Sequence, residues 1–194
     1  MTIQHETREA WLNQVGAGLA AGPFAAAGAE VPTNWRAAIG FPSTGRKGKR
    51  IGECWASAAS ADGHFEILIR PDVDQPMELA AILAHELIHA TVGLAAKHGP
   101  KFRRVAVAIG LEGKMTATTH GLAFRAALAP ILDAAGPVPH AALGFGASSA
   151  PPKQSTRMIK CQCAECGYVV RTARSWIDDM GAPLCPAHGA MEVV

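Results

Sequence analysis

The segment His85-Glu86-Leu87-Ile88-His89 constrains this chain more than any other feature of its sequence. Two histidines four positions apart lie one above the other on a single face of an α-helix, so their ring nitrogens can converge on one metal ion. Glu86 lies about 100° further round the helix, where its carboxylate can reach an attacking water without binding the metal. The motif therefore predicts a zinc ion held by a helix, with Glu86 as the acid–base group beside it.

The residues around this motif predict a helix over about 75–92. Asp74 or Gln75 can cap it, Pro76 suits its first turn, and Gly93 can end it. Its other side chains are apolar nearly all round, which is typical of a buried central helix. Two imidazoles and a carboxylate are costly to bury without partners, so the motif is predicted to serve a metal site.

A catalytic zinc needs a third protein ligand and keeps a fourth position open. We predict that His98 is the third ligand, because Gly93 and Gly99 allow the chain to reverse toward the first helix. Glu112 and His120 are the alternatives. The sequence does not identify the group that would stabilise the negatively charged oxygen (oxyanion) of a reaction intermediate. The candidates are His120, Arg103 or a backbone amide.

The end of the chain carries a second set of metal-ligand residues. Two ligand pairs have matching spacing and are each followed by glycine: Cys163-x-x-Cys166 and Cys185-x-x-His188. They predict a structural Cys3His zinc ribbon with no open position, whose metal keeps the short segment folded. Cys161 is the alternative to His188. A β-hairpin carrying Tyr168, Val169, Val170 and Trp176 is expected between the pairs.

Composition bounds the class of protein. The chain has 194 residues, 49% of them hydrophobic, which is enough for a packed core. The chain has no long run of large apolar residues, so a membrane span is not expected. The N-terminus lacks the basic region of a secretory signal, and we therefore expect a cytoplasmic protein. The lone Cys54 is expected to be a buried small side chain, and Trp11, Trp55 and Trp176 are expected in cores.

The order of the patterns predicts an α+β fold in four parts. We expect an N-terminal helical segment over 1–30 and a main domain over 31–135. A linker rich in proline, glycine and alanine follows over 136–156, and the zinc ribbon covers 157–194. Within the main domain, Asp62-Gly63 predicts a two-residue turn that joins strands at 51–59 and 64–70. Further helices are expected over 100–109 and 121–134.

Local basic clusters are present although the net charge is only +2. The stretch between Glu30 and Glu53 holds five basic residues and no acidic ones: Arg36, Arg46, Lys47, Lys49 and Arg50. With aromatic residues interleaved, it could contact single-stranded nucleic acid; a solvated loop is the alternative. A second cluster flanks His98 and consists of Lys97, Lys101, Arg103 and Arg104.

The spacing of His85-Glu86-Leu87-Ile88-His89 and His98-Gly99-x-x-Phe102 resembles the SprT-like metallopeptidases, which include the Spartan DNA–protein-crosslink proteases. The resemblance implies that His85, His89 and His98 bind a catalytic zinc and that Glu86 is the catalytic base. It implies a zincin-like α+β domain with a small antiparallel or mixed sheet, whose edge strand can pair with an extended peptide. Many members also end in a zinc ribbon.

The resemblance leads to a functional expectation and leaves one alternative. We expect a zinc-dependent endopeptidase that acts on proteins or peptides, with DNA-associated proteins as a substrate class suggested by the Spartan branch. The alternative is a non-catalytic nucleic-acid-binding protein, which would use the zinc ribbon and the basic 36–50 loop, with Arg46, Lys47, Lys49 and Arg50 as the contact residues.

Overall fold

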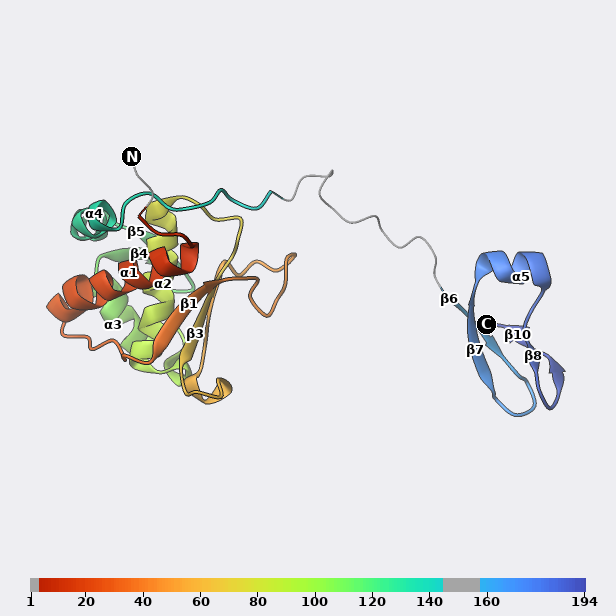
Figure 1. Ribbon diagram of the computed structural model, residues 1–194. Helices are drawn as coiled ribbons and strands as arrows, with labels where there is room; N and C mark the ends of the chain where they lie inside the picture. Colours follow the sequence, from red (N-terminus) through yellow and green to blue (C-terminus); the bar gives the residue numbers. More distant parts are fainter. Residues whose placement is uncertain (1–3, 145–157) are drawn as a thin grey trace. The chain divides into compact units, whose positions relative to one another are not determined.

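The structure is a computed structural model that describes residues 4–144 and 158–194. The chain divides into two compact units, residues 1–145 and 146–194, each with its own arrangement of helices and strands (Figure 1). Small sheets and five α-helices in the described residues give the α+β class predicted from the sequence. The predicted linker over 136–156 is described as far as residue 144, and the rest of it lies outside the described residues.

The N-terminal helix α1 (Arg8–Leu19) is part of the core of the first unit. Thr7 caps it, because its hydroxyl accepts a hydrogen bond from the N–H of Ala10. The helix continues into a π-helical turn, η1 (Ala20–Phe24). One face is fully buried: Trp11, Leu12, Val15 and Leu19. The segment over 1–30 and the domain predicted over 31–135 therefore share one hydrophobic core.

A three-stranded sheet forms the second layer of this unit. Strand β3 (Phe65–Ile69) lies in the middle, parallel to β1 (Trp35–Ile39) and antiparallel to β2 (Gly52–Trp55). The predicted pairing of the segment near 51–59 with the segment near 64–70 is confirmed, with Cys54 opposite Ile67. Strand β2 is an edge strand of this sheet.

The predicted two-residue turn at Asp62-Gly63 is wrong. Strand β2 ends at Trp55, and residues 56–64 with the short 3-10 helix η2 (Ser57–Ala59) make the connection to β3. Asp62 instead holds this loop against the sheet, because its carboxylate accepts hydrogen bonds from Arg36 on β1 at 2.8 Å and from the Ser60 hydroxyl at 2.7 Å.

Helix α2 (Pro76–Val92) runs through the middle of the first unit (Figure 1). Pro76 lies in its first turn and Gly93, at φ +81°, ends it, so the prediction for 75–92 is confirmed. It contacts β2 and β3 of the sheet as well as α1, α3 (Pro100–Ala108) and α4 (Leu122–Ala135). Ten of its residues are buried, as expected for a helix that is apolar on nearly every face.

A small hairpin that was not predicted from the sequence lies beside α2. Strands β4 (Leu111–Lys114) and β5 (Ala117–His120) pair antiparallel, with only Met115 and Thr116 between them. β5 contacts α2, so the hairpin brings its side chains to the helix that carries the histidine motif.

The second unit is built on a sheet of β6 (Met158–Gln162), β7 (Val169–Ala173) and β10 (Glu192–Val193), with β6 in the middle. Helix α5 (Arg174–Met180) follows β7. Strands β8 (Leu184–Cys185) and β9 (Gly189–Ala190) form a second small hairpin. Four buried residues make its core: Cys161, Cys163, Cys185 and Met191.

Two tryptophan predictions are wrong. Trp176 belongs to α5 instead of a hairpin strand, and its exposed fraction is 61%. The neighbouring Ile177 packs against the small core, and consecutive residues on a helix point about 100° apart, so Trp176 faces outward. Trp55 lies on the edge strand with an exposed fraction of 42%. The fully buried Trp11 agrees with its prediction.

No helix in residues 4–144 or 158–194 combines the length and apolarity needed to cross a membrane.

Candidate metal centres

The three predicted histidine ligands converge in the first unit. His85 and His89 lie one turn apart on α2, and His98 follows the short 3-10 helix η3 (Leu94–Ala96). The Nε2 atom of His98 lies 3.1 Å from Nε2 of His85 and 3.2 Å from Nε2 of His89. The three ligand atoms lie within 4.8 Å of one another, so this group could hold one metal ion.

The chain reversal that returns His98 to α2 uses two residues in the left-handed region. Gly93 has φ +81° as predicted, but the second such residue is Lys97, at φ +46°. Gly99 has φ −75°, which any residue can adopt, but there is little space for a side chain there. A Cβ at position 99 would lie 3.0 Å from the carbonyl oxygen of Ala96. Glycine is therefore needed at 93 for its conformation and at 99 for space.

Phe102 packs against all three imidazoles. Its ring centroid lies 4.8, 4.7 and 5.0 Å from those of His85, His89 and His98. The side chain is fully buried at the first turn of α3. Phe102 therefore restricts the orientation of every ring in the group, which places the ring nitrogens before an ion binds.

The surroundings of the histidines favour neutral rings. Burial lowers the pKa of His85 to about 3 and that of His89 to about 4, and the neighbouring imidazoles act in the same direction. Burial also lowers the pKa of His98. Neutral imidazoles keep the lone pair that a metal ion requires, so the site does not have to lose protons at neutral pH.

Thr118 on β5 contacts the His85 ring at Nδ1, the nitrogen that does not face the other histidines. Its Oγ1 lies 2.8 Å from Nδ1 of His85. If the ring N–H donates to the hydroxyl oxygen, the proton stays on Nδ1 and Nε2 is left as the metal-binding atom. This contact could not be predicted from the sequence, because it joins residues 33 positions apart.

Glu86 is buried beside the histidines, with an exposed fraction of 7%. Its carboxylate accepts a hydrogen bond from the backbone N–H of Cys54 on β2. Burial raises the pKa of Glu86 to about 8, and the nearby carboxylate of Glu53 adds to the increase. A metal cation at the three histidines would act in the opposite direction. Burial and a nearby cation therefore have opposite effects on the pKa of this carboxyl group.

Gly52 lets the edge strand approach this carboxylate. A Cβ at position 52 would lie 2.6 Å from Oε1 of Glu86 and 2.6 Å from a methyl carbon of Ile82. Cys54, two residues further along β2, is buried as predicted, and burial raises the pKa of its thiol to about 12. Position 52 thus serves close packing, and Cys54 has the properties of an unreactive core side chain.

The histidine group opens into a cleft with a volume of about 1560 Å³. Its walls come from β2, α2, the η3 turn and β5, and His120 and Arg125 lie on its surface together with the three histidines and Glu86. Among the described residues, the two alternative third ligands, Glu112 and His120, are not in the metal-ligand group.

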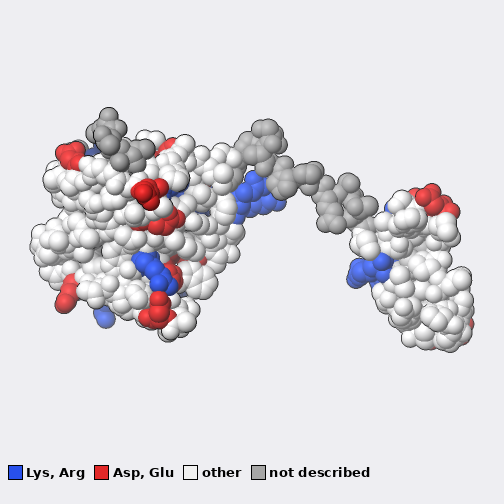
Figure 2. Space-filling model, viewed as in Figure 1, with Lys and Arg blue, Asp and Glu red and all other residues white. Residues whose placement is uncertain are grey.

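The predicted nucleic-acid residues lie on the loop between β1 and β2, where Lys and Arg side chains gather in Figure 2. Arg46, Lys47, Lys49 and Arg50 are all exposed. Arg50 forms an ion pair with Glu53, and Lys49 and Arg50 reach the rim of the cleft. Arg36 is not part of this surface, because Asp62 and Glu66 bind its guanidinium.

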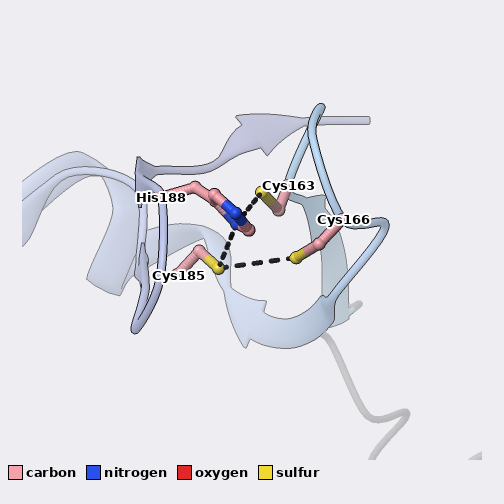
Figure 3. A group of neighbouring side chains, drawn as sticks. All are labelled: Cys163, Cys166, Cys185 and His188. Atoms are coloured by element: carbon pink, nitrogen blue, oxygen red, sulfur yellow. Dashed lines mark hydrogen bonds between the residues drawn. The ribbon is translucent and has the colours of Figure 1, made fainter.

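A second group of metal-ligand side chains lies in the C-terminal unit, where four side chains point toward one another (Figure 3). The sulfurs of Cys166 and Cys185 are 3.7 Å apart, and Nδ1 of His188 lies 3.6 Å from the sulfurs of Cys163 and of Cys185. These four residues could hold one metal ion. Cys161, the alternative to His188, is buried in the small core and is not in the group.

Backbone amides lower the pKa of one thiol in this second group. The N–H of Ala187 donates a hydrogen bond to the sulfur of Cys185, and with His188 it lowers the pKa of that thiol to about 6. Gly167 and Gly189, at φ +72° and +86°, each follow a ligand pair and allow the tight turns. A thiol that loses its proton near neutral pH is a ready ligand for a metal cation.

Comparisons with protein families, curated proteins and solved structures found no match to this chain.

Proposed function

We propose that this protein is a zinc-dependent endopeptidase of the SprT-like kind, with a zincin-like catalytic domain. The observation that supports this most directly is the joint position of three imidazole nitrogens and one buried carboxylate in a single open cleft. The three nitrogens are those of His85, His89 and His98, and the carboxylate is that of Glu86. Three protein ligands leave the fourth position of a tetrahedral ion for water or substrate.

The spacing of the histidines fits zinc. Zinc–nitrogen bonds of about 2.0–2.1 Å in a tetrahedron place the nitrogens about 3.3 Å apart. The observed separations of His98 Nε2 from the other two nitrogens are 3.1 and 3.2 Å. Phe102 and Thr118 already fix the rings, so binding the ion would require little rearrangement.

The proposed reaction is hydrolysis of a peptide bond. A zinc ion held by the three imidazoles would supply a Lewis acid that increases the acidity of the attacking water and polarises the scissile carbonyl. Glu86 accepts a proton from the water while the water oxygen bonds to the carbonyl carbon. It then delivers this proton to the amide nitrogen as the carbon–nitrogen bond breaks, which leaves a carboxyl and an amino end.

The edge strand offers a place for an extended substrate. Among the residues that the structure describes, β2 pairs with β3 on one side only, and its residues 52–55 line the cleft beside Glu86. An extended peptide that pairs with the outer side of such a strand is held by main-chain hydrogen bonds that do not depend on its sequence. A segment without stable structure is therefore the expected substrate.

The C-terminal group is proposed to hold a structural zinc. Tetrahedral zinc with zinc–sulfur bonds of about 2.3 Å places two sulfurs about 3.8 Å apart and a sulfur and a nitrogen about 3.6 Å apart. The observed values are 3.7 and 3.6 Å. Cys163, Cys166, Cys185 and His188 fill every position, so this ion has a structural role.

The test of the proposed function is cleavage of unfolded casein by the wild type and by Glu86→Gln. The wild type should cleave casein, and a chelator should abolish the cleavage. Glu86→Gln keeps the size of the side chain but cannot accept the proton, so it should retain its zinc and lose cleavage. Full cleavage by Glu86→Gln would rule out the proposed mechanism, and a wild type without cleavage would rule out the function.

A second candidate function is nucleic-acid binding, proposed from the exposed basic residues at the cleft rim. Lys49 and Arg50 line the cleft, and the exposed Arg46 and Lys47 precede them on the same loop. A nucleic acid bound by these four residues would lie next to the cleft, which would suit the cleavage of DNA-associated proteins. Binding of single-stranded DNA should then weaken steeply as salt rises, and replacing these four residues should flatten that dependence. An unchanged salt dependence would remove this candidate.

A further inference from the structure

His120 lies on the same side of its strand as a residue that contacts the metal-site histidines. It ends β5, and alternate residues of a strand point to the same face. Thr118 and His120 are partly buried, whereas Ala117 and Thr119 are exposed. His120 therefore lies on the face of β5 that carries Thr118, whose hydroxyl contacts the His85 ring, and it lines the same cleft as Glu86.

Arg125 determines which nitrogen of His120 carries the proton. Its Nε–H donates a hydrogen bond of 2.9 Å to Nδ1 of His120. A guanidinium has no acceptor atom, so Nδ1 must accept and the ring proton must lie on Nε2. Arg125 belongs to the first turn of α4, which follows β5 directly after Gly121. The ring is thereby oriented with Nε2–H as a hydrogen-bond donor.

We propose that His120 is a catalytic residue that stabilises the oxyanion of the tetrahedral intermediate, and that Arg125 is its positioning residue. This inference rests on the proposed peptidase function. When the water oxygen bonds to the carbonyl carbon, the carbonyl π electrons move to the oxygen, and Glu86 takes the proton of the water. The Nε2–H of His120 donates a hydrogen bond to this negatively charged oxygen and releases it when the carbonyl forms again.

The other side chain considered from the sequence as an oxyanion donor, Arg103, lies elsewhere. Arg103 of α3 faces a separate hollow formed by Gly99, Pro100 and Arg104 next to His98, and it does not line the main cleft. The tyrosine of the chain, Tyr168, belongs to the C-terminal unit. Among the candidates raised from the sequence, His120 is thus the side chain that combines a place in the cleft with a fixed donor.

The primary test is the kinetics of peptide cleavage by His120→Ala. Loss of one oxyanion donor lowers kcat by about 10²–10³-fold, and a donor that acts mainly in the transition state leaves KM nearly unchanged. His120→Gln, which keeps an N–H donor, should retain part of the rate. The matched control is His64→Ala, a histidine outside the cleft, and it should behave as the wild type.

Binding of a transition-state mimic gives a readout that does not depend on turnover. The probe is the peptide that the wild type cleaves fastest, with its scissile amide replaced by a phosphinate. His120→Ala should weaken binding of this probe by a factor similar to its loss in kcat and should leave binding of the product peptides unchanged. Zinc content should stay at the wild-type value, because His120 is not a ligand. If His120→Ala does not fold, the same measurements on His120→Gln decide.

The positioning role of Arg125 has its own readout. In nitrogen NMR spectra, Nδ1 of His120 should be unprotonated in the wild type and partly protonated in Arg125→Ala. Wild-type kcat and phosphinate affinity in His120→Ala would overturn the inference, as would loss of zinc from that variant. Failure of the peptidase proposal is a different result, in which the wild type itself does not cleave.

Discussion

The hydroxyl oxygen of Thr118 lies 2.8 Å from Nδ1 of His85, and this contact connects the β4–β5 hairpin to the helix that carries the histidine motif. Outer contacts of this kind fix the ring orientation and tautomer of a metal ligand. The same strand continues to His120, so one short hairpin contacts a histidine of the candidate metal site and brings to the cleft the side chain proposed as the oxyanion donor.

Thr118→Val should weaken zinc binding at the histidine site. It keeps the branched shape of the side chain but removes the hydroxyl, so the His85 ring loses its partner. Such losses reduce metal affinity by about 10–100-fold. Competition with a chromophoric chelator measures the affinity, and Thr118→Ser, which restores the hydroxyl, should return it to near the wild-type value. Equal affinities in the wild type and the valine variant would contradict the role of the contact.

Gly52→Ala should impair catalysis while zinc stays bound. The added Cβ would meet Oε1 of Glu86 and a methyl group of Ile82, both at 2.6 Å, and would push the carboxylate out of place. Overpacking of this kind also costs about 1–3 kcal/mol in the free energy of unfolding. Gly40→Ala is the matched control, because the nearest atom to its Cβ is 3.5 Å away. Normal kcat in Gly52→Ala would show that the strand can yield without moving Glu86.

Cys185→Ser and Cys161→Ala should separate a ligand from a core residue in the C-terminal unit. Both cysteines are buried, but only Cys185 is in the metal-ligand group. The first variant should lose about one zinc per chain and the order of residues 158–194, since small metal-held units unfold without their ion. The second should keep its zinc. Elemental analysis and amide NMR spectra measure the two effects, and zinc loss in Cys161→Ala would revise the ligand set.

Trp11→Ala should destabilise the first unit far more than Trp176→Ala destabilises the second. Trp11 is fully buried, and its indole N–H donates a hydrogen bond of 2.9 Å to the carbonyl of Gly136. Truncating a buried tryptophan costs about 3–5 kcal/mol in the free energy of unfolding. The exposed fraction of Trp176 is 61%, so Trp176→Ala should lower the free energy of unfolding by about 0.5 kcal/mol or less. Denaturant unfolding gives both values, and similar costs would contradict the burial pattern.

The parts of the site that could be predicted depend on local spacing. His85 and His89 are four residues apart on one helix, and His98 follows after a short reversal, so their convergence can be read from a segment of 14 residues, 85–98. The Cys and His pairs of the C-terminal unit are equally local. The helix boundaries at Pro76 and Gly93 follow from the conformations that these two residues favour.

The parts that could not be predicted depend on distant pairings. Thr118 and Gly52 reach His85 and Glu86 only because β5 and β2 pack against α2. The β4–β5 turn, Met115-Thr116, lacks the glycine or asparagine that usually marks a two-residue turn. Asp62-Gly63 has that signature, but Arg36 and Ser60 bind its aspartate and hold it in a longer loop.

The most direct measurement is the zinc content per chain of the wild type and of His98→Ala, by elemental analysis of the purified protein. Two separate groups of ligands predict about two zinc ions in the wild type and about one in the variant, because removal of one of three ligands empties the histidine site while the four-ligand site keeps its ion. A wild-type content of one, or a content of two in His98→Ala, would contradict the proposed catalytic zinc site.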